Sequence, residues 1–211
     1  VGSAVTFFTV WAVYRFSFGP SRALGGISVP FPDVFEGIAD VIVHNSRGHL
    51  AYLLGQTSQH GFWYYYPVAL SVKLPLAFLA LLFAGIWFGW KQRHPAILML
   101  TGASLGILVV GAIGNINIGI RHVLPLLILF SPIAAYAALS GVTPGSAAVR
   151  NGTLALLVWI ALSSAFSHPD YLAYFNELAL GKPTRILADS DLDWGQDIQR
   201  AQARLRQLNV P

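Results

Sequence analysis

Arg121 and His122 stand between two long apolar runs, and this placement makes them the first candidates for chemistry. The sequence holds no carboxylate between Asp40 and Asp170, so Arg121 has no acidic partner nearby in the chain. A guanidinium donates paired hydrogen bonds to phosphate oxygens, and a low dielectric strengthens them. We therefore expect Arg121, with His122 beside it, to contact a phosphate on a ligand. An interfacial arginine that meets lipid headgroups is the alternative.

A second polar segment, residues 44–64, mixes imidazole, amide, guanidinium and aromatic groups. Donors of this kind bind the hydroxyls of a sugar or a lipid headgroup, while aromatic rings cover the apolar face of a sugar. We expect part of this segment to line a substrate cavity: His44, Asn45, Arg47, His49, Tyr52, His60 and Tyr64. A solvated loop above a membrane is the alternative. Its histidines also raise the question of a metal site, but no carboxylate or cysteine lies in the run.

Alternating carboxylates occur near the C-terminus, at Asp189, Asp191 and Asp193. Their spacing is similar to that of a calcium loop, but the glycine falls one position late and Arg200 occupies the position of the closing glutamate. No cofactor is therefore certain, and a divalent metal at these three aspartates stays as a weaker alternative. The structural interpretation is that Asp193 caps the start of an amphipathic helix, with Gln196 in the capping-box position.

The elements that must position these residues are apolar helices. Hydrophobic residues make up 55% of the chain and charged residues only 10%. A helix of roughly 20 apolar residues crosses a bilayer. We expect an all-α, polytopic transmembrane bundle with about five spans, over residues 1–14, 64–90, 96–113, 123–139 and 153–167. Lys73 lies inside the second span, where it must snorkel or face a wet cavity, and Pro75 can kink that span.

The predicted organisation has a transmembrane region over residues 1–168 and the start of an external C-terminal segment, helical or mixed, over residues 169–211. An external loop at about residues 16–63 contains a short amphipathic helix that lies on the membrane surface. The chain enters an apolar run at its first residue and ends on a charged helix. We therefore expect it to be cut from a longer protein at both ends.

Basic residues of short loops predict the orientation of the bundle. Residues 91–94 and Arg150 fall on one side, which the positive-inside bias assigns to the cytoplasm. Residues 16–63, 115–122 and 169–211 then share the outer face of a plasma membrane. Cysteine is absent, which excludes disulfides and thiolate metal sites. No basic run with interleaved aromatic residues indicates nucleic acid.

Four segments occur in an order that resembles the C-terminal half of bacterial family 39 glycosyltransferases. They are YYYPVALSVKLP (64–75), IGIRHVLP (118–125), HPDYLAYFNE (168–177) and DSDLDWGQD (189–197). This GT-C family includes membrane enzymes related to protein O-mannosyltransferases and the lipid A aminoarabinose transferase. The resemblance implies that a hexose or pentose moves from a polyprenyl-phosphate carrier to a protein or lipid acceptor outside the bacterial inner membrane. It implies that Arg121 and His122 contact the donor phosphate, with Lys73 as a second candidate.

The resemblance does not supply a catalytic base. The family's base is a carboxylate of the first external loop, and none of these four segments corresponds to that loop. Asp33, Glu36 and Asp40 therefore receive no catalytic role, and we expect the chain alone to be inactive. Two other classes stay open: a transporter or flippase of lipid-linked sugars, and a non-catalytic membrane scaffold. A transporter predicts internal repeats and broken helices at mid-membrane, whereas a scaffold leaves Arg121 unexplained.

Overall fold

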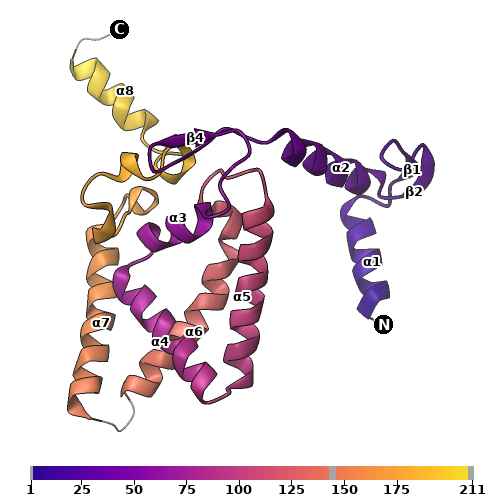
Figure 1. Cartoon of the computed structure of the whole chain (residues 1–211). Coiled ribbons are helices and arrows are strands. Elements are labelled where there is room, and N and C mark those ends of the chain that lie inside the picture. Colours follow the sequence, from indigo (N-terminus) through magenta and orange to yellow (C-terminus); the bar gives the residue numbers. More distant parts are fainter. Residues whose placement is uncertain (1, 143–145, 209–211) are drawn as a thin grey trace. The chain divides into compact units, whose positions relative to one another are not determined.

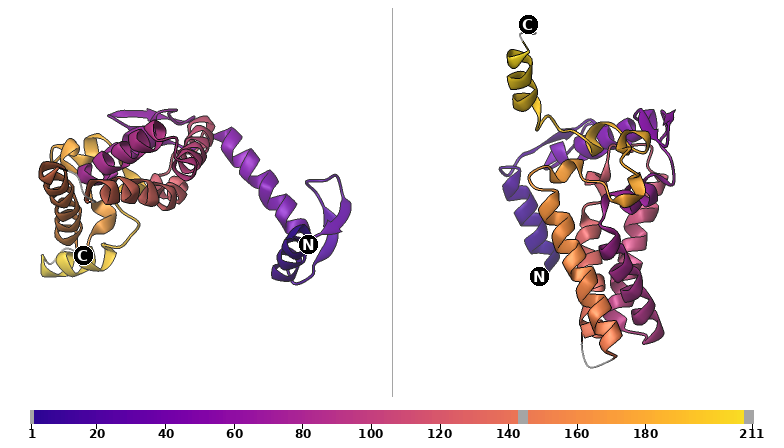
Figure 2. Two further views of the ribbon diagram at one scale, coloured as in Figure 1. Left: turned by 90° about the horizontal axis from the view of Figure 1, so that it is seen from below. Right: turned by 90° about the vertical axis from the view of Figure 1, so that its left-hand side faces the viewer.

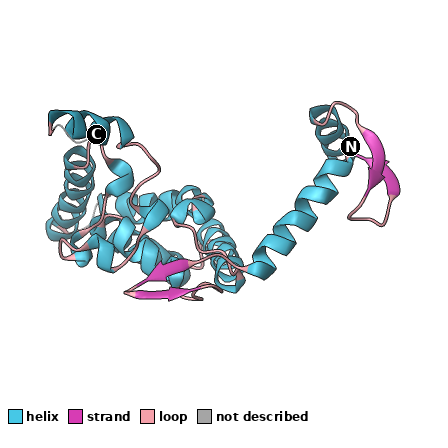
Figure 3. Cartoon of the chain, turned by 90° about the horizontal axis from the view of Figure 1, so that it is seen from above, coloured by secondary structure: helices cyan, strands magenta, loops and turns pink. Residues whose placement is uncertain are grey.

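The computed structural model describes residues 2–142 and 146–208, and these consist mostly of helices (Figure 3). The strands among them form two antiparallel hairpins: β1 (Phe18–Ser21) with β2 (Ile27–Pro30), and β3 (Ala51–Leu53) with β4 (Gln56–Ser58). Both hairpins fall inside the loop predicted over residues 16–63, so the chain is mostly helical and not all-α. It divides into two compact units, Val1–His49 and Leu50–Pro211.

The first unit contains α1 (Gly2–Val13), the β1–β2 hairpin and α2 (Pro32–Arg47). Pro32 begins α2, where its missing N–H costs no helical hydrogen bond. Glu36 ties this helix to the hairpin turn: its carboxylate accepts hydrogen bonds from the Ser21 hydroxyl at 3.0 Å and the Ala23 amide at 3.2 Å. Aromatic rings of α1 contact the residues around α2, as between Phe7 and Phe31, whose centroids are 5.3 Å apart.

Helix α2 is the amphipathic helix expected from the sequence. Its apolar side chains Ile38, Val41 and Ile42 are all exposed. Asp33 stands in its first turn and Arg47 in its last, which suits the direction of the helix dipole. The existence of the helix is confirmed, while its position on a membrane surface stays a prediction.

The second unit is built on a bundle of α4 (Leu76–Lys91), α5 (Pro95–Ile113), α6 (Pro125–Val142) and α7 (Ala147–Phe166) (Figures 1 and 2). Helix α3 (Tyr65–Lys73) and the turn η1 (Ile120–Val123) lie at one end of this bundle, and the α4–α5 connection lies at the other (Figure 1). After α7 come four short 3₁₀ turns, η2 (Tyr171–Ala173), η3 (Glu177–Ala179), η4 (Pro183–Arg185) and η5 (Asp189–Asp191), and then α8 (Ile198–Gln207).

Three helices of the described chain, α5, α6 and α7, are long and apolar enough to cross a membrane. Helices α3 and α4 meet the same test only together and are bent by 118° at their junction. Helix α1 is shorter, with 12 residues. The structure thus supports a polytopic membrane protein with three spans, or four if the bent pair counts as one. The expected number of about five is not confirmed.

Glycine permits the close contact of helix α6 with α4 and with α7. A Cβ atom on Gly85 of α4 would lie 2.1 Å from the carbonyl oxygen of Ile133 in α6. A Cβ atom on Gly141 of α6 would lie 2.2 Å from the hydroxyl oxygen of Thr153 in α7. Small residues allow this approach, and packing of this kind holds helices together where lipid removes the hydrophobic driving force. These contacts hold α4 against α6 and α6 against α7.

Candidate functional site

Four segments of the sequence, residues 64–75, 118–125, 168–177 and 189–197, meet at one end of the bundle, around the buried carboxylate of Asp191. This residue ends η5 and is 1% exposed. Its Oδ2 atom accepts a hydrogen bond from the Tyr65 hydroxyl at 2.6 Å, and its Oδ1 atom accepts one from the Ile120 amide at 3.0 Å. A buried carboxylate is costly unless it is bonded in this way. We call Tyr65, Lys73, Asn176, Asp191 and the backbone groups that they bond the Asp191 hub.

The hub fixes the turn that precedes Arg121. The Gly119 amide donates to the Tyr65 hydroxyl at 3.1 Å, and the Ser190 hydroxyl donates to the Ile118 carbonyl at 2.8 Å. Gly119 has a φ of 89°, in the region that favours glycine. A Cβ atom there would also lie 3.0 Å from Oδ1 of Asp191. The backbone that leads into Arg121 is therefore held from the α3 side and from η5.

From its position in an apolar segment we expected Lys73 to snorkel or to face a wet cavity. It does neither. It is 7% exposed. Its ammonium group donates to the backbone carbonyls of Leu172 at 2.7 Å, Tyr174 at 3.2 Å and Asp191. It also lies 4.1 Å from the centroid of the Phe175 ring. All three N–H donors are occupied, which leaves none for the phosphate contact predicted for Lys73, so this arrangement favours a structural role.

Asn176 fills the break between α3 and α4. Leu74 is extended, as expected before a proline, and Pro75 has no N–H with which to continue the helix. The carbonyls released at this break find their donors on Asn176. Its side-chain amide donates to the carbonyls of Ser71 at 2.6 Å and Leu74 at 2.7 Å, and its backbone amide donates to the carbonyl of Val72 at 2.8 Å. Backbone groups near lipid need such partners.

Arg121 and His122 lie in η1, the turn between α5 and α6, and both side chains are exposed. The guanidinium carbon of Arg121 is 5.7 Å from the centroid of the Trp194 ring. Among the described residues Arg121 has no salt bridge, since the ion pairs found there belong to Arg200. Desolvation lowers the pKa of His122, and the charge of Arg121 lowers it further. The site thus presents an exposed guanidinium beside an imidazole whose protonation is disfavoured.

The residues predicted to line a substrate cavity belong to both units. His44, Asn45 and Arg47 lie in the last turns of α2. The ring centroids of His44 and His49 are 6.3 Å apart. The second unit contains Tyr52 in β3, His60 after β4 and Tyr64 at the start of α3. The Tyr64 ring contacts its neighbours, with its centroid 5.4 Å from that of Trp63. A shared role in one cavity stays a prediction.

The three aspartates proposed as a metal alternative have separate environments. Asp191 is committed to the hub, whereas Asp193 accepts a hydrogen bond from the Gly195 amide at 2.6 Å. Asp189 is exposed and has a φ of 55°. In residues 2–142 and 146–208, no group of three or more His, Cys, Asp or Glu side chains is placed to hold a metal ion.

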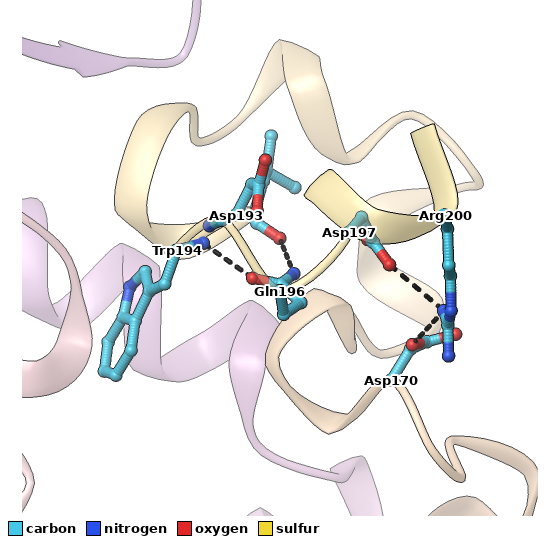
Figure 4. Close-up of polar contacts among 8 residues, drawn as sticks. Asp170, Asp193, Trp194, Gln196, Asp197 and Arg200 are labelled. Carbon is cyan, nitrogen blue, oxygen red and sulfur yellow. Dashed lines mark hydrogen bonds and ion pairs between the residues drawn. The ribbon is translucent and has the colours of Figure 1, made fainter. Parts of the chain in front are cut away.

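Helix α8 starts later than the capping pattern predicted. Asp197 precedes its first residue, and Asp193 stabilises a loop instead (Figure 4). In that loop the Gln196 side chain accepts a hydrogen bond from the Trp194 amide at 2.7 Å. The indole N–H of Trp194 donates to the Ser190 carbonyl. Trp194 is thereby tied to η5 while its ring stays exposed.

Comparison of the chain with protein-family models, with curated proteins and with solved structures finds no match. The family resemblance therefore rests on the four sequence segments alone. What the structure adds is the position of these segments. Residues from all four are joined by hydrogen bonds: Tyr65 and Lys73 from the first, Gly119 and Ile120 from the second, residues 172–176 from the third and Asp191 from the fourth.

Sequence reasoning missed the roles of Asp191 and Asn176. One signal was present in each case. A lysine in an apolar segment needs nearby acceptors, and a proline in that segment frees carbonyls that need donors. These requirements predict polar partners for Lys73 and for the residues before Pro75, but they do not identify them.

Proposed function

We propose that this chain belongs to an integral membrane glycosyltransferase, which moves a sugar from a polyprenyl-phosphate carrier to a protein or lipid acceptor. In this proposal Arg121 binds the phosphate of the carrier. The observation that carries the proposal is the exposed guanidinium of Arg121, which forms no salt bridge within the described chain and stands where the four segments meet. In this proposal that end of the bundle faces outward from a bacterial inner membrane.

The chemistry explains why a fixed cation is useful. Transfer breaks the bond between the anomeric carbon of the sugar and a phosphate oxygen, while the acceptor oxygen forms a new bond to that carbon. Negative charge develops on the departing lipid phosphate, and a preplaced guanidinium stabilises it. The proton of the acceptor passes to a base, for which this chain supplies no assigned residue. The Asp191 hub supports the role of Arg121 because it holds the preceding backbone.

An apolar hollow between α3, α4, α5 and α6 suits a lipid-linked substrate. It has a volume of about 290 Å³ and is lined almost entirely by aliphatic and aromatic side chains such as Leu79, Leu105 and Phe130. A hollow of this kind, in helices that cross a membrane, could take part of an isoprenoid chain. It adds a binding surface for the carrier that is separate from the phosphate contact.

A transporter of lipid-linked sugars is the second candidate, and the break between α3 and α4 favours it, because broken helices form the substrate sites of transporters. In those sites the released carbonyls bind ions or substrate. Here the carbonyls of Ser71, Val72 and Leu74 are bonded to Asn176. The break is therefore filled by protein, which fits a fixed structural joint better than a transport site.

Donor turnover by the full-length protein in lipid nanodiscs tests the proposal. Polyprenyl-phosphate sugars are supplied as donors, and the release of polyprenyl phosphate is measured. We expect Arg121→Ala to lower turnover by about 10²–10³-fold, the cost of removing a group that stabilises transition-state charge. Arg121→Lys should retain part of it. Arg150→Ala, which removes an exposed arginine of α7, is the matched control.

The outcomes separate the two candidates. Native turnover in Arg121→Ala would contradict the phosphate role. Movement of the lipid-linked sugar across a vesicle membrane, with no release of polyprenyl phosphate, would favour the transporter.

A further inference from the structure

A groove lined by both aromatic and charged side chains lies beside the Asp191 hub, and the proposed phosphate contact does not use it. Residues 169–172 form one wall, and Trp194, Gln196, Asp197 and Arg200 form the other. Arg200 joins the walls, since its guanidinium bonds Asp170 at 2.7 Å and Asp197 at 3.1 Å (Figure 4). The groove has a volume of about 300 Å³. This is at the lower end of the range for small-molecule sites and suits one or two sugar rings.

The groups in this groove are those that bind saccharides. Tyr171 and Trp194 are 57% and 55% exposed, although each is anchored: Tyr171 contacts His168 at 3.1 Å, and the indole N–H of Trp194 donates to Ser190. Exposed aromatic faces carry negative charge density and attract the polarised C–H groups of a sugar. Their anchoring reduces the entropy lost when a ligand binds.

Free acceptors complement the two rings. Arg200 bonds only the Oδ1 atoms of Asp170 and Asp197. Within residues 2–142 and 146–208 the Oδ2 atoms of both carboxylates have no hydrogen-bond partner, so each can accept a bond from a hydroxyl group. The pairing with Arg200 also offsets their negative charge. The groove therefore favours a neutral polyhydroxylated ligand over a simple cation.

We propose that this groove is a saccharide-binding subsite in which Trp194 and Tyr171 stack on a pyranose ring and Asp170 and Asp197 accept hydrogen bonds from its hydroxyls. The inference rests on the proposed function. Trp194 connects the two sites, because it lines the groove and is also the ring that Arg121 approaches at 5.7 Å. A sugar in the groove would be next to a phosphate bound at Arg121. The ring could belong to the donor or to a saccharide acceptor.

Saturation-transfer NMR on the full-length protein in nanodiscs tests this subsite. The probes are methyl α-D-mannopyranoside and methyl β-D-glucopyranoside, each with its sugar 1-phosphate. We expect saturation of the ring protons of at least one pair, and a loss of affinity of at least about tenfold in Trp194→Ala and in Asp170→Asn. Trp194→Phe should retain binding because it keeps an aromatic face. Trp90→Ala removes a tryptophan that is 73% exposed on α4 and is the matched control.

Comparison of each methyl glycoside with its sugar 1-phosphate shows whether the bound sugar ring belongs to the donor or to an acceptor. If the groove holds the sugar of the donor, the sugar 1-phosphate binds at least about tenfold more tightly than the methyl glycoside, and Arg121→Ala removes this gain. If it holds an acceptor, the two bind equally and Arg121→Ala changes neither. The Asp170→Asn variant should remain folded, because the Asp170 side chain is exposed and does not contact the hub. A loss of binding in this variant is therefore not a folding defect.

Two results would overturn the subsite. One is unchanged glycoside binding in both Trp194→Ala and Asp170→Asn, and the other is no binding of any probe by the unaltered protein. Donor turnover that depends on Arg121, without any saccharide contact at the groove, would remove the subsite and leave the proposed function in place. Saccharide binding at the groove, with turnover that does not depend on Arg121, would support the subsite and contradict the proposed role of Arg121.

Discussion

The hydroxyl group of Tyr65 donates a 2.6 Å hydrogen bond to Oδ2 of Asp191, a residue 126 positions further along the chain. The same hydroxyl accepts a bond from the Gly119 amide at 3.1 Å. One phenol thus joins the start of α3, the turn before Arg121 and the segment after α7. Its removal should weaken the fold and the position of Arg121 together.

We expect Tyr65→Phe to lower the free energy of unfolding by about 1–3 kcal/mol, because it leaves a buried carboxylate oxygen and a buried amide without a partner. The measurement is unfolding in mixed detergent micelles. Tyr52→Phe is the matched control, since the Tyr52 hydroxyl has no hydrogen-bond partner in the part of the chain that the structure describes. Equal stability of the two variants would contradict the role given to the hub.

Lys73→Met should act on stability and not specifically on donor binding. The variant leaves the carbonyls of Leu172, Tyr174 and Asp191 without a donor, at a cost of about 1–3 kcal/mol for each buried group that finds no new partner. Lys91→Met, at the exposed end of α4, is the control. Thermal unfolding and the affinity for polyprenyl phosphate are measured together. A loss of affinity with native stability would restore Lys73 as a phosphate ligand.

Gly85→Ala should separate α4 from α6. The added Cβ would meet the Ile133 carbonyl oxygen, which is backbone and cannot rotate away, so we expect a loss of about 1–3 kcal/mol. Gly102→Ala is the control because a Cβ there has no neighbour within 4 Å. Gly102 also lies inside a helix, so the change in helix propensity is the same. The midpoint of thermal unfolding distinguishes the two, and a shift of equal size in both would exclude close packing at Gly85.

The link between α2 and the β1–β2 turn should depend on pH. The hydrogen bond from the Ala23 amide is the main cause that lowers the pKa of Glu36 from its ordinary value of 4.5, and the Ser21 hydroxyl and the Arg22 amide add to it. Because the folded pKa is lowered, the carboxylate stabilises the turn fully above the unfolded pKa. This contribution is lost as the pH falls through the folded pKa.

Amide hydrogen exchange measures this effect. The protection of the Arg22 and Ala23 amides, corrected for intrinsic exchange, should decrease below about pH 4 and stay constant above pH 6. In Glu36→Gln the protection should be lower at neutral pH and should no longer change with pH. A pH dependence that persists in the glutamine variant would assign it to another group.

The sequence predicted the long helices well because each is a local apolar run. The spans expected over residues 96–113 and 123–139 correspond to α5 and α6, and the amphipathic pattern around Ile38 corresponds to α2. The two hairpins were missed because strands of three or four residues are too short to show a period. The effect of Pro75 was understated: a kink was predicted, and the chain turns by 118°.

The site could be predicted only in part, for a physical reason. The exposed Arg121 and its missing ion pair follow from local sequence. The hydrogen-bond partners of Lys73 and Asp191 lie 71 to 126 positions away in the chain, and no local pattern encodes such pairings. Asp191 was considered for metal binding because its neighbours are acidic, but burial against Tyr65 and Ile120 separates it from them.

The affinity for a lipid phosphate at Arg121 tests the central claim most directly. Undecaprenyl phosphate and undecaprenol, which lacks the phosphate, are titrated into the full-length protein in nanodiscs, and both are measured again in Arg121→Ala and Arg150→Ala. We predict that the phosphate raises affinity by at least about tenfold, that Arg121→Ala removes this preference, and that Arg150→Ala keeps it. An equal affinity for the two lipids, or a preference that survives in Arg121→Ala, would contradict the claim.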